Sequence, residues 1–283
     1  MSTFTSAGHA CLPNTQSYQV DGPFGPMLIS VAAPHVPDEG LSLMQANRPW
    51  PVVYIVDANL MFGALVDQLR MLQFSGHVPP CLMVGIGYPD FDLSDFSARR
   101  TLELTPTKWS SPWSSGEVES GGADATLAFL KDHVKAFINQ RYPTDPDISC
   151  LAGLSFGGLF TLYARAQAEP KFTHHIALSP SLFWDDRLVL KLMQAGLESE
   201  QPASGRLYVA AGSLEMEITP PDEPEMVTNI QMVQNVVSLG TLCATHRDLI
   251  EAKVEILSGE SHHSIMGPGL TRGLRYIFQD PYL

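Results

Sequence analysis

The chain has 283 residues, a length at which one hydrophobic core can still fill one domain, so residues 1–283 are predicted to form a single domain. Seventeen Lys and Arg residues against 30 Asp and Glu residues give a formal net charge of −13, which disfavours nucleic acid and anionic membrane surfaces as partners. The sequence has neither a bilayer-spanning apolar run nor a start of secretory type, and it therefore predicts a soluble, cytoplasmic protein.

Short apolar runs alternate with longer helical patterns along the chain. The runs predicted to be strands are residues 27–33, 52–57, 81–87, 148–154, 173–179, 206–211 and 253–258. Apolar residues recur at helical spacing in residues 60–73, 123–141, 157–168, 227–247 and 270–279. Several strands are apolar throughout, which is typical of strands covered on both faces. The alternation predicts an α/β fold with a mostly parallel central sheet and helices on both faces.

Two irregular stretches interrupt this alternation. Residues 90–122 are rich in Ser and Pro, and residues 213–225 contain Pro220, Pro221 and Pro224. Both follow predicted strands, where α/β folds place functional loops, so we predict loop insertions near an active site. The four cysteines are far apart in the sequence, which predicts free thiols; no metal site is expected.

The sharpest motif is Gly153-Leu154-Ser155-Phe156-Gly157-Gly158, which lies between a predicted strand and a predicted helix. A strand that turns directly into a helix needs small residues around the serine, and the turn exposes the hydroxyl at the helix N-terminus. A glycine-rich turn with a merely helix-capping serine would give a similar sequence. The strand before it and the helix after it favour a catalytic nucleophile at Ser155.

A serine hydroxyl needs a general base, and in folds of this class the histidine follows the last strand. The last predicted strand, residues 253–258, is followed by His262 and His263. Adjacent side chains cannot both point at one serine, so one is predicted to be the base and the other to belong to the loop or pocket wall. Surface or packing roles are expected for the remaining seven histidines.

An acid that orients the imidazole is expected after the preceding strand, residues 206–211. Glu215 is the first choice at that place. The alternatives are Glu217, Asp222 and Asp185, and a Ser–His dyad without an acid is a further one.

Backbone N–H groups that stabilise a developing oxyanion are expected at two places in such a fold. The residue after the nucleophile, Phe156, supplies one of them. The second is expected from the loop after an early strand, residues 57–60, where Asn59 is the favoured donor.

Together these motifs resemble the putative esterase family of α/β-hydrolases, which includes esterase D, mycolyltransferases and enterochelin-type siderophore esterases. The resemblance spans most of the chain, and its landmarks are residues 53–59, 84–88, 99–106, 153–158, 179–184 and 259–262. The run through Arg100 and the Ser-Pro-Ser run are most like the siderophore-esterase branch. In that branch the histidine follows a Gly-Glu-Thr type triplet, so the resemblance implies that His262, rather than His263, is the base. One departure is Asp57-Ala58 in the oxyanion loop, where relatives often have Asp-Gly.

Two side chains are candidate substrate contacts. Arg100 lies in a predicted loop, where it would reach a carboxylate or phenolate of the substrate; the alternative is a surface pair with Glu103. Trp184 is predicted to wall an acyl or aromatic pocket, and packing under the loops is the alternative for the nearby aromatic residues Phe183, Trp109 and Trp113.

The sequence therefore predicts a serine carboxylic-ester hydrolase that works through an acyl-enzyme and needs no metal or organic cofactor. Its expected partner is a small-molecule ester of siderophore or secondary-metabolite type. The alternatives are an acyltransferase that uses the same Ser–His site and a catalytically silent binding protein with a hydrolase-like fold.

Overall fold

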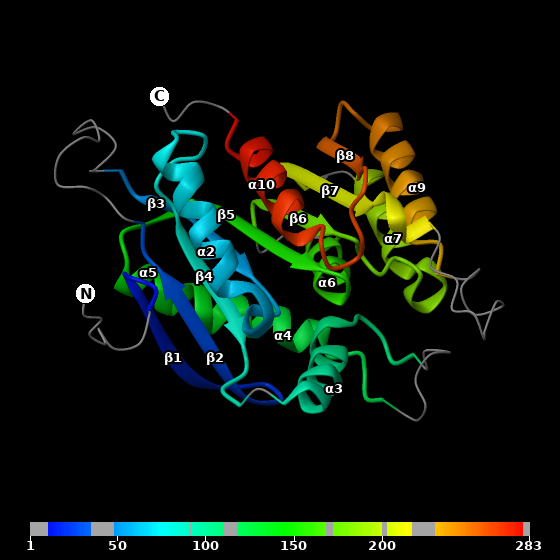
Figure 1. The fold of residues 1–283 in the computed structure, drawn as a ribbon. Helices are drawn as coiled ribbons and strands as arrows, with labels where there is room; N and C mark the ends of the chain where they lie inside the picture. Colours follow the sequence, from blue (N-terminus) through cyan, green and yellow to red (C-terminus); the bar gives the residue numbers. More distant parts are fainter. Residues whose placement is uncertain are drawn as a thin grey trace, which may run out of the picture.

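A sheet of eight strands runs through the computed structural model (Figure 1). The structure describes residues 11–34, 48–90, 92–109, 118–167, 172–199, 203–216 and 230–279. In space the strands follow the order β1-β2-β4-β3-β5-β6-β7-β8. The first two pair antiparallel with each other and β2 pairs antiparallel with β4, whereas all further pairings are parallel. The predicted α/β fold with a mostly parallel sheet is thereby confirmed.

The strands alternate with helices, as predicted. The strands are β1 (Thr15–Gly22), β2 (Gly25–Ala32), β3 (Trp50–Ile55), β4 (Leu82–Gly87), β5 (Thr144–Leu154), β6 (His174–Leu178), β7 (Arg206–Gly212) and β8 (Glu251–Leu257). The helices are α2 (Ala58–Phe74), α3 (Leu93–Leu104), α4 (Ala123–Phe129), α5 (Ala136–Arg141), α6 (Phe156–Arg165), α7 (Trp184–Leu197), α9 (Met232–Thr245) and α10 (Met266–Ile277). A π-helical turn, η1 (Leu130–Lys135), joins α4 to α5, and a 3₁₀ turn, η2 (Ser213–Met216), follows β7. None of the helices in the described segments is long and apolar enough to cross a bilayer.

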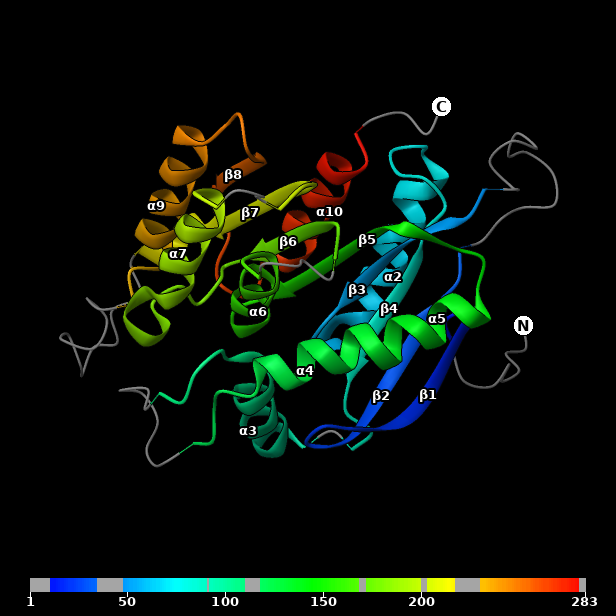
Figure 2. The same cartoon turned by 180° about the vertical axis from the view of Figure 1, so that it is seen from behind.

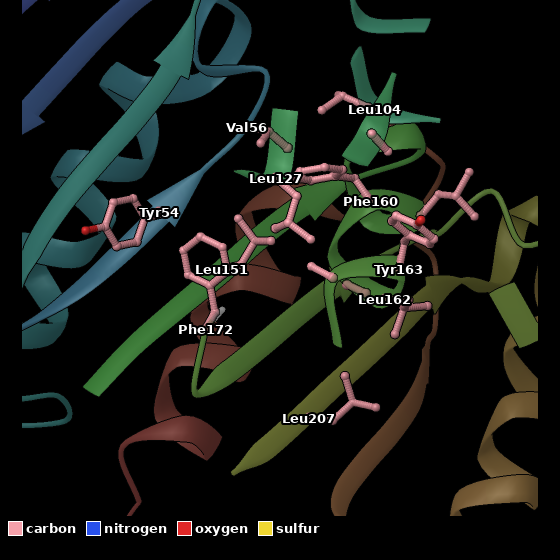
Figure 3. Close-up of a cluster of buried hydrophobic side chains, with 14 of the residues drawn as sticks. Tyr54, Val56, Leu104, Leu127, Leu151, Phe160, Leu162, Tyr163, Phe172 and Leu207 are labelled. Atoms are coloured by element: carbon pink, nitrogen blue, oxygen red, sulfur yellow. The ribbon is translucent and has the colours of Figure 1, made fainter. Parts of the chain in front are cut away.

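Helices cover the sheet from both sides. Figure 1 shows α2 and α10 in front of the sheet, and Figure 2, from behind, shows α4, α5, α6, α7 and α9 over the other face. Two buried clusters correspond to the two faces, and Leu69 of α2 belongs to one while Leu127 of α4 belongs to the other. Figure 3 shows the cluster that contains Leu127, in which Tyr54 of the sheet packs edge-on against Phe172 with ring centroids 5.3 Å apart. Because both faces are buried, the central strands are apolar at nearly every position.

Three elements differ from the sequence-based expectation. Strand β1 was not predicted, because its side chains alternate between exposed and half-buried and it carries few apolar residues. Helix α3 lies inside residues 90–122, which were expected to be irregular; Asp92 caps it by accepting hydrogen bonds from the N–H groups of Ser94 and Asp95. Helix α7 was not predicted either; in the structure Asp185 and the two residues after it have positive φ and interrupt its first turn.

Candidate active site

The turn at Ser155 joins the end of β5 directly to the start of α6. Ser155 has φ 62° and ψ −118°, a strained conformation for a residue with a side chain. A Cβ atom on Gly153 would lie 2.4 Å from the carbonyl carbon and oxygen of Gly157, so no larger residue fits at that position. A Cβ on Gly158 would lie 2.8 Å from the Leu178 carbonyl oxygen. The glycines of the motif thus allow the close approach of strand and helix that holds Ser155 in this conformation.

Two neighbouring main-chain segments hold this turn in place. The N–H of Ser155 donates to the carbonyl of Leu178, at the end of β6, over 3.0 Å. The N–H of Ser181 donates to the carbonyl of Ser155 over 3.2 Å, and the two hydroxyl oxygens are 3.4 Å apart. The side chain of Ser155 therefore contacts the Ser-Pro-Ser run that follows β6.

Glu215 and His262 form the central polar contact of the site. Glu215 lies on η2 directly after β7, His262 lies between β8 and α10, and the Oε2 atom of Glu215 is 2.7 Å from Nδ1 of His262. The Glu215 residue is 4% exposed, and its Oε1 atom accepts hydrogen bonds from the Ser179 hydroxyl, at 2.5 Å, and the Gly212 N–H, at 2.7 Å. The structure thus brings the first-choice acid and the first-choice base into contact.

The charge state of Glu215 follows from these contacts. Burial raises the pKa of the carboxyl group, but hydrogen bonds from His262, Ser179 and the Gly212 N–H outweigh burial and hold the pKa below its usual value. An ionised carboxylate only accepts hydrogen bonds, so Nδ1 of His262 is the donor in this contact, and in a neutral ring Nε2 is then the acceptor.

Two of the competing candidates, His263 and Asp185, lie in other contacts. The ring of His263 packs edge-on against that of His262, with centroids 5.2 Å apart. Asp185 lies in α7, where its carboxylate accepts a hydrogen bond from the Thr107 hydroxyl. Glu217 and Asp222 lie outside the described residues.

The two expected oxyanion donors, Asn59 and Phe156, lie in the first turns of α2 and α6. N–H groups in a first helical turn have no acceptor within their own helix, so they can point at a ligand. The Asn59 side chain fixes its turn, because its amide exchanges two hydrogen bonds of 2.7 Å with the main chain of Tyr88. Both helices begin beside the carboxyl ends of the adjacent parallel strands β3 and β5.

Arg100 lies on helix α3 and not in a loop, which corrects the sequence-based placement. Its guanidinium forms a two-point ion pair with Asp57, at 3.0 and 2.7 Å, and packs 5.2 Å above the ring of Phe156. The alternative partner, Glu103, instead pairs with Arg99 at 2.6 Å. Burial lowers the pKa of Arg100, but the Asp57 carboxylate outweighs burial and raises it. The Arg100 guanidinium is thus already bound by Asp57, and its direct contact with a substrate stays a prediction.

Trp184 was expected to wall a substrate pocket, but its residue is only 1% exposed. Its ring packs edge-on against Phe156 at 5.3 Å and against Trp109 at 4.8 Å, and its indole N–H donates to Thr107. The structure corrects the expectation, because Trp184 packs against Phe156 and offers almost no surface to a ligand. Trp113 lies outside the described residues.

A cavity of about 810 Å³ is lined in part by Trp109. Its lining residues are Phe24, Leu102, Lys108, Trp109, Val118, Glu119, Ser120, Gly121 and Gly122. Ser155, Glu215 and His262 are not among them. Within the described parts of the chain, no group of three or more His, Cys, Asp and Glu side chains is arranged to hold a metal ion.

Sequence reasoning missed Asp57 and Ser179 as members of the site. The motifs that contain them were noticed, yet their partners Arg100 and Glu215 are distant in sequence. Only the adjacency of the strands in the folded sheet brings each pair together.

Comparisons with known proteins identify a family and a fold for the chain. The family model described as "Putative esterase" matches residues 35–248. The siderophore triacetylfusarinine C esterase of Aspergillus fumigatus is 31% identical over 95% of this chain and 94% of its own length. The ferri-bacillibactin esterase BesA of Bacillus subtilis is 29% identical over 80% of this chain and 78% of its own. Among solved structures, the siderophore hydrolase EstA of Aspergillus nidulans superposes with a TM-score of 0.83 at 26% identity, covering 99% of both chains, which confirms the α/β-hydrolase fold.

Proposed function

The chain belongs to the "Putative esterase" family, and from this premise we propose that it is a serine carboxylic-ester hydrolase that acts on siderophore esters. The observation that carries the proposal is the 2.7 Å contact between Glu215 and His262 at the same sheet edge as Ser155. Relatives named as siderophore esterases, similar over most of the chain, support the substrate class.

In the proposed reaction, His262 is the general base. Its Nε2 takes the proton of the Ser155 hydroxyl while the oxygen attacks the ester carbonyl, and Glu215 stabilises the positive charge that forms on the ring. The negative charge on the carbonyl oxygen is stabilised by the N–H groups of Phe156 and Asn59. The ring then gives its proton to the departing alkoxide, which leaves as an alcohol.

The second half of the reaction releases the acid. Water loses a proton to His262 and attacks the acyl carbonyl, and the proton then returns to the oxygen of Ser155 as the bond to the carbonyl carbon breaks. An alcohol in place of water would give acyl transfer. Analysis of products in the presence of an added acceptor alcohol separates the two outcomes.

Labelling with a fluorophosphonate probe tests the nucleophile. We expect one adduct on Ser155 in the wild-type protein and none in Ser155→Ala. Ser149→Ala is the matched control, since Ser149 is a buried serine of the same strand, away from the sheet edge that carries the site. Absence of an adduct on Ser155 in folded wild-type protein refutes the proposed role.

Hydrolysis of a siderophore trilactone or a fusarinine-type ester, followed by chromatography, tests the substrate class. We expect Ser155→Ala to lower turnover by several orders of magnitude, because only binding and the oxyanion donors remain. Turnover of a simple p-nitrophenyl ester without turnover of any siderophore ester would retain the hydrolase and refute the substrate class. The cytoplasmic location stays a prediction, which fractionation of producing cells would test.

A further inference from the structure

Ser179 occupies an unusual position beside the site. It directly follows β6, is 0% exposed, and has φ 38°, in the left-handed region that favours glycine. Its N–H donates to the carbonyl of Ala210 in the neighbouring strand β7 over 2.7 Å. Glycine would adopt this φ without strain, so the side chain is held here at a conformational cost.

The hydroxyl of Ser179 is hydrogen-bonded to the buried carboxylate of Glu215. Its Oγ atom is 2.5 Å from Oε1, and because the carboxylate is ionised the hydroxyl is the donor. Such charge-assisted O–H donors to carboxylates are short and strong. The hydrogen bond joins the segment after β6 to the segment after β7.

The described donors to Glu215 divide between its two oxygens. Oε1 accepts from Ser179 and from the Gly212 N–H, while Oε2 accepts from His262. Helix α9, which packs against the η2 turn, has no charged side chain between Met232 and Thr245. Without the Ser179 hydroxyl, the Gly212 N–H would be the one donor to Oε1 left among the described residues, and the carboxylate would be freer to rotate about its Cγ–Cδ bond.

We propose that Ser179 is a positioning residue of the hydrolytic reaction, whose hydroxyl fixes the Glu215 carboxylate so that Oε2 faces Nδ1 of His262. This inference rests on the proposed function. Ser179 touches neither the substrate nor the reacting atoms; it acts through Glu215 on the orientation and proton position of the imidazole. The positioning is needed when the ring becomes positively charged, so its loss should lower kcat and leave KM nearly unchanged.

Two variants remove the hydroxyl with opposite effects on the backbone. Ser179→Ala keeps a Cβ at positive φ, whereas Ser179→Gly relieves that strain, so a shared effect is due to the hydroxyl and not to the backbone. We expect both to lower kcat about 10- to 100-fold, the range that corresponds to losing one hydrogen bond to a charged group. Ser149→Ala is the control, because it also removes a buried, hydrogen-bonded serine hydroxyl but leaves the site intact.

A double-variant cycle with Glu215→Gln distinguishes positioning from a structural role. In the Glu215→Gln background the carboxylate is already gone, so removing the Ser179 hydroxyl should change kcat by less than about 3-fold. Thermal denaturation of each variant verifies folding, and if Ser179→Ala fails to fold, the less strained Ser179→Gly carries the measurement.

Three results would overturn the inference. One is an active wild-type protein in which both Ser179 variants match Ser149→Ala in kcat. Another is an equal loss of kcat with and without the Glu215 carboxylate, which would indicate a general structural effect. The third is a folded wild-type protein that hydrolyses no ester, and that result alone would also refute the proposed function.

Discussion

The buried ion pair between Asp57 and Arg100 is a sharp test of the fold next to the site. Its side chains are 2% and 17% exposed, and two hydrogen bonds of 3.0 and 2.7 Å join them. Asp57→Asn keeps the size and shape of the side chain, and Asn tolerates the φ of 59° at this position. The substitution therefore removes the negative charge and leaves the partly buried Arg100 guanidinium without its counter-ion.

The expected cost follows from that burial. Breaking a buried pair by removing one partner destabilises a protein by about 3 to 5 kcal/mol. Arg100 keeps some contact with solvent, so we expect the free energy of unfolding of Asp57→Asn to fall by about 3 kcal/mol, the lower end of that range. Arg100→Met should lower the free energy of unfolding by a similar amount, because it leaves the buried Asp57 carboxylate without its counter-ion. The double variant should lose less than the sum of the two, by about 2 kcal/mol.

Urea denaturation followed by circular dichroism measures these values. The control is Glu251→Gln, which breaks the pair between Arg206 and Glu251; the Glu251 side chain is 54% exposed, and a loss below about 1 kcal/mol is expected. Additivity of Asp57→Asn and Arg100→Met within about 0.5 kcal/mol would refute a coupled buried pair. A loss for Asp57→Asn no larger than that of the control would do the same.

Other expected results concern the turn, the pH dependence and the thiols. Gly153→Ala should abolish soluble folded protein on expression, since its Cβ would overlap the Gly157 backbone, whereas Gly63→Ala in α2 should raise the thermal midpoint, because its Cβ has space. Burial lowers the pKa of His174 to about 4, below the value of 6.5 in the unfolded chain. The free energy of unfolding should therefore fall as the pH drops from 6.5 towards 4. His174→Asn should reduce this dependence on pH, as measured by urea denaturation at each pH. Cys11 is exposed, while burial raises the pKa values of the remaining thiols, Cys81, Cys150 and Cys243. Dithionitrobenzoate should therefore react quickly with Cys11 in native protein and with all four cysteines after unfolding.

How much of this could be predicted from the sequence depends on how local each signal is. The turn at Ser155 is encoded by adjacent glycines, and the apolar runs of β3 and β4 reflect burial on both faces. The contact of Glu215 with His262 followed from strand order, because side chains after adjacent parallel strands meet at one edge. The positions expected for these elements were therefore close to those observed.

Signals that depend on distant partners could not be found in this way. Nothing in the sequence near Arg100 indicates that its partner is Asp57, 43 residues away, since only folding brings the two side chains into contact. The same holds for Trp184. Its sequence context fits a pocket wall and a buried packing residue equally well, and only the folded structure shows that Trp109 and Phe156 pack on it. Strand β1 escaped notice because an exposed edge strand needs few apolar side chains.

The segments that follow the strands hold one another through the main chain as well as through side chains. The segments after β7 and β8 are joined by the main chain, because the Leu214 N–H donates to the carbonyl of Glu260 over 3.0 Å. A Cβ on Gly212 would lie 2.2 Å from that same carbonyl oxygen, so the approach requires glycine. The segment after β6 contacts both sides, with Ser181 at the main chain of Ser155 and Ser179 at Glu215. Since the Ser-Pro-Ser run is hydrogen-bonded to both Ser155 and Glu215, a shift of the residues after β6 would displace the serine and the acid together.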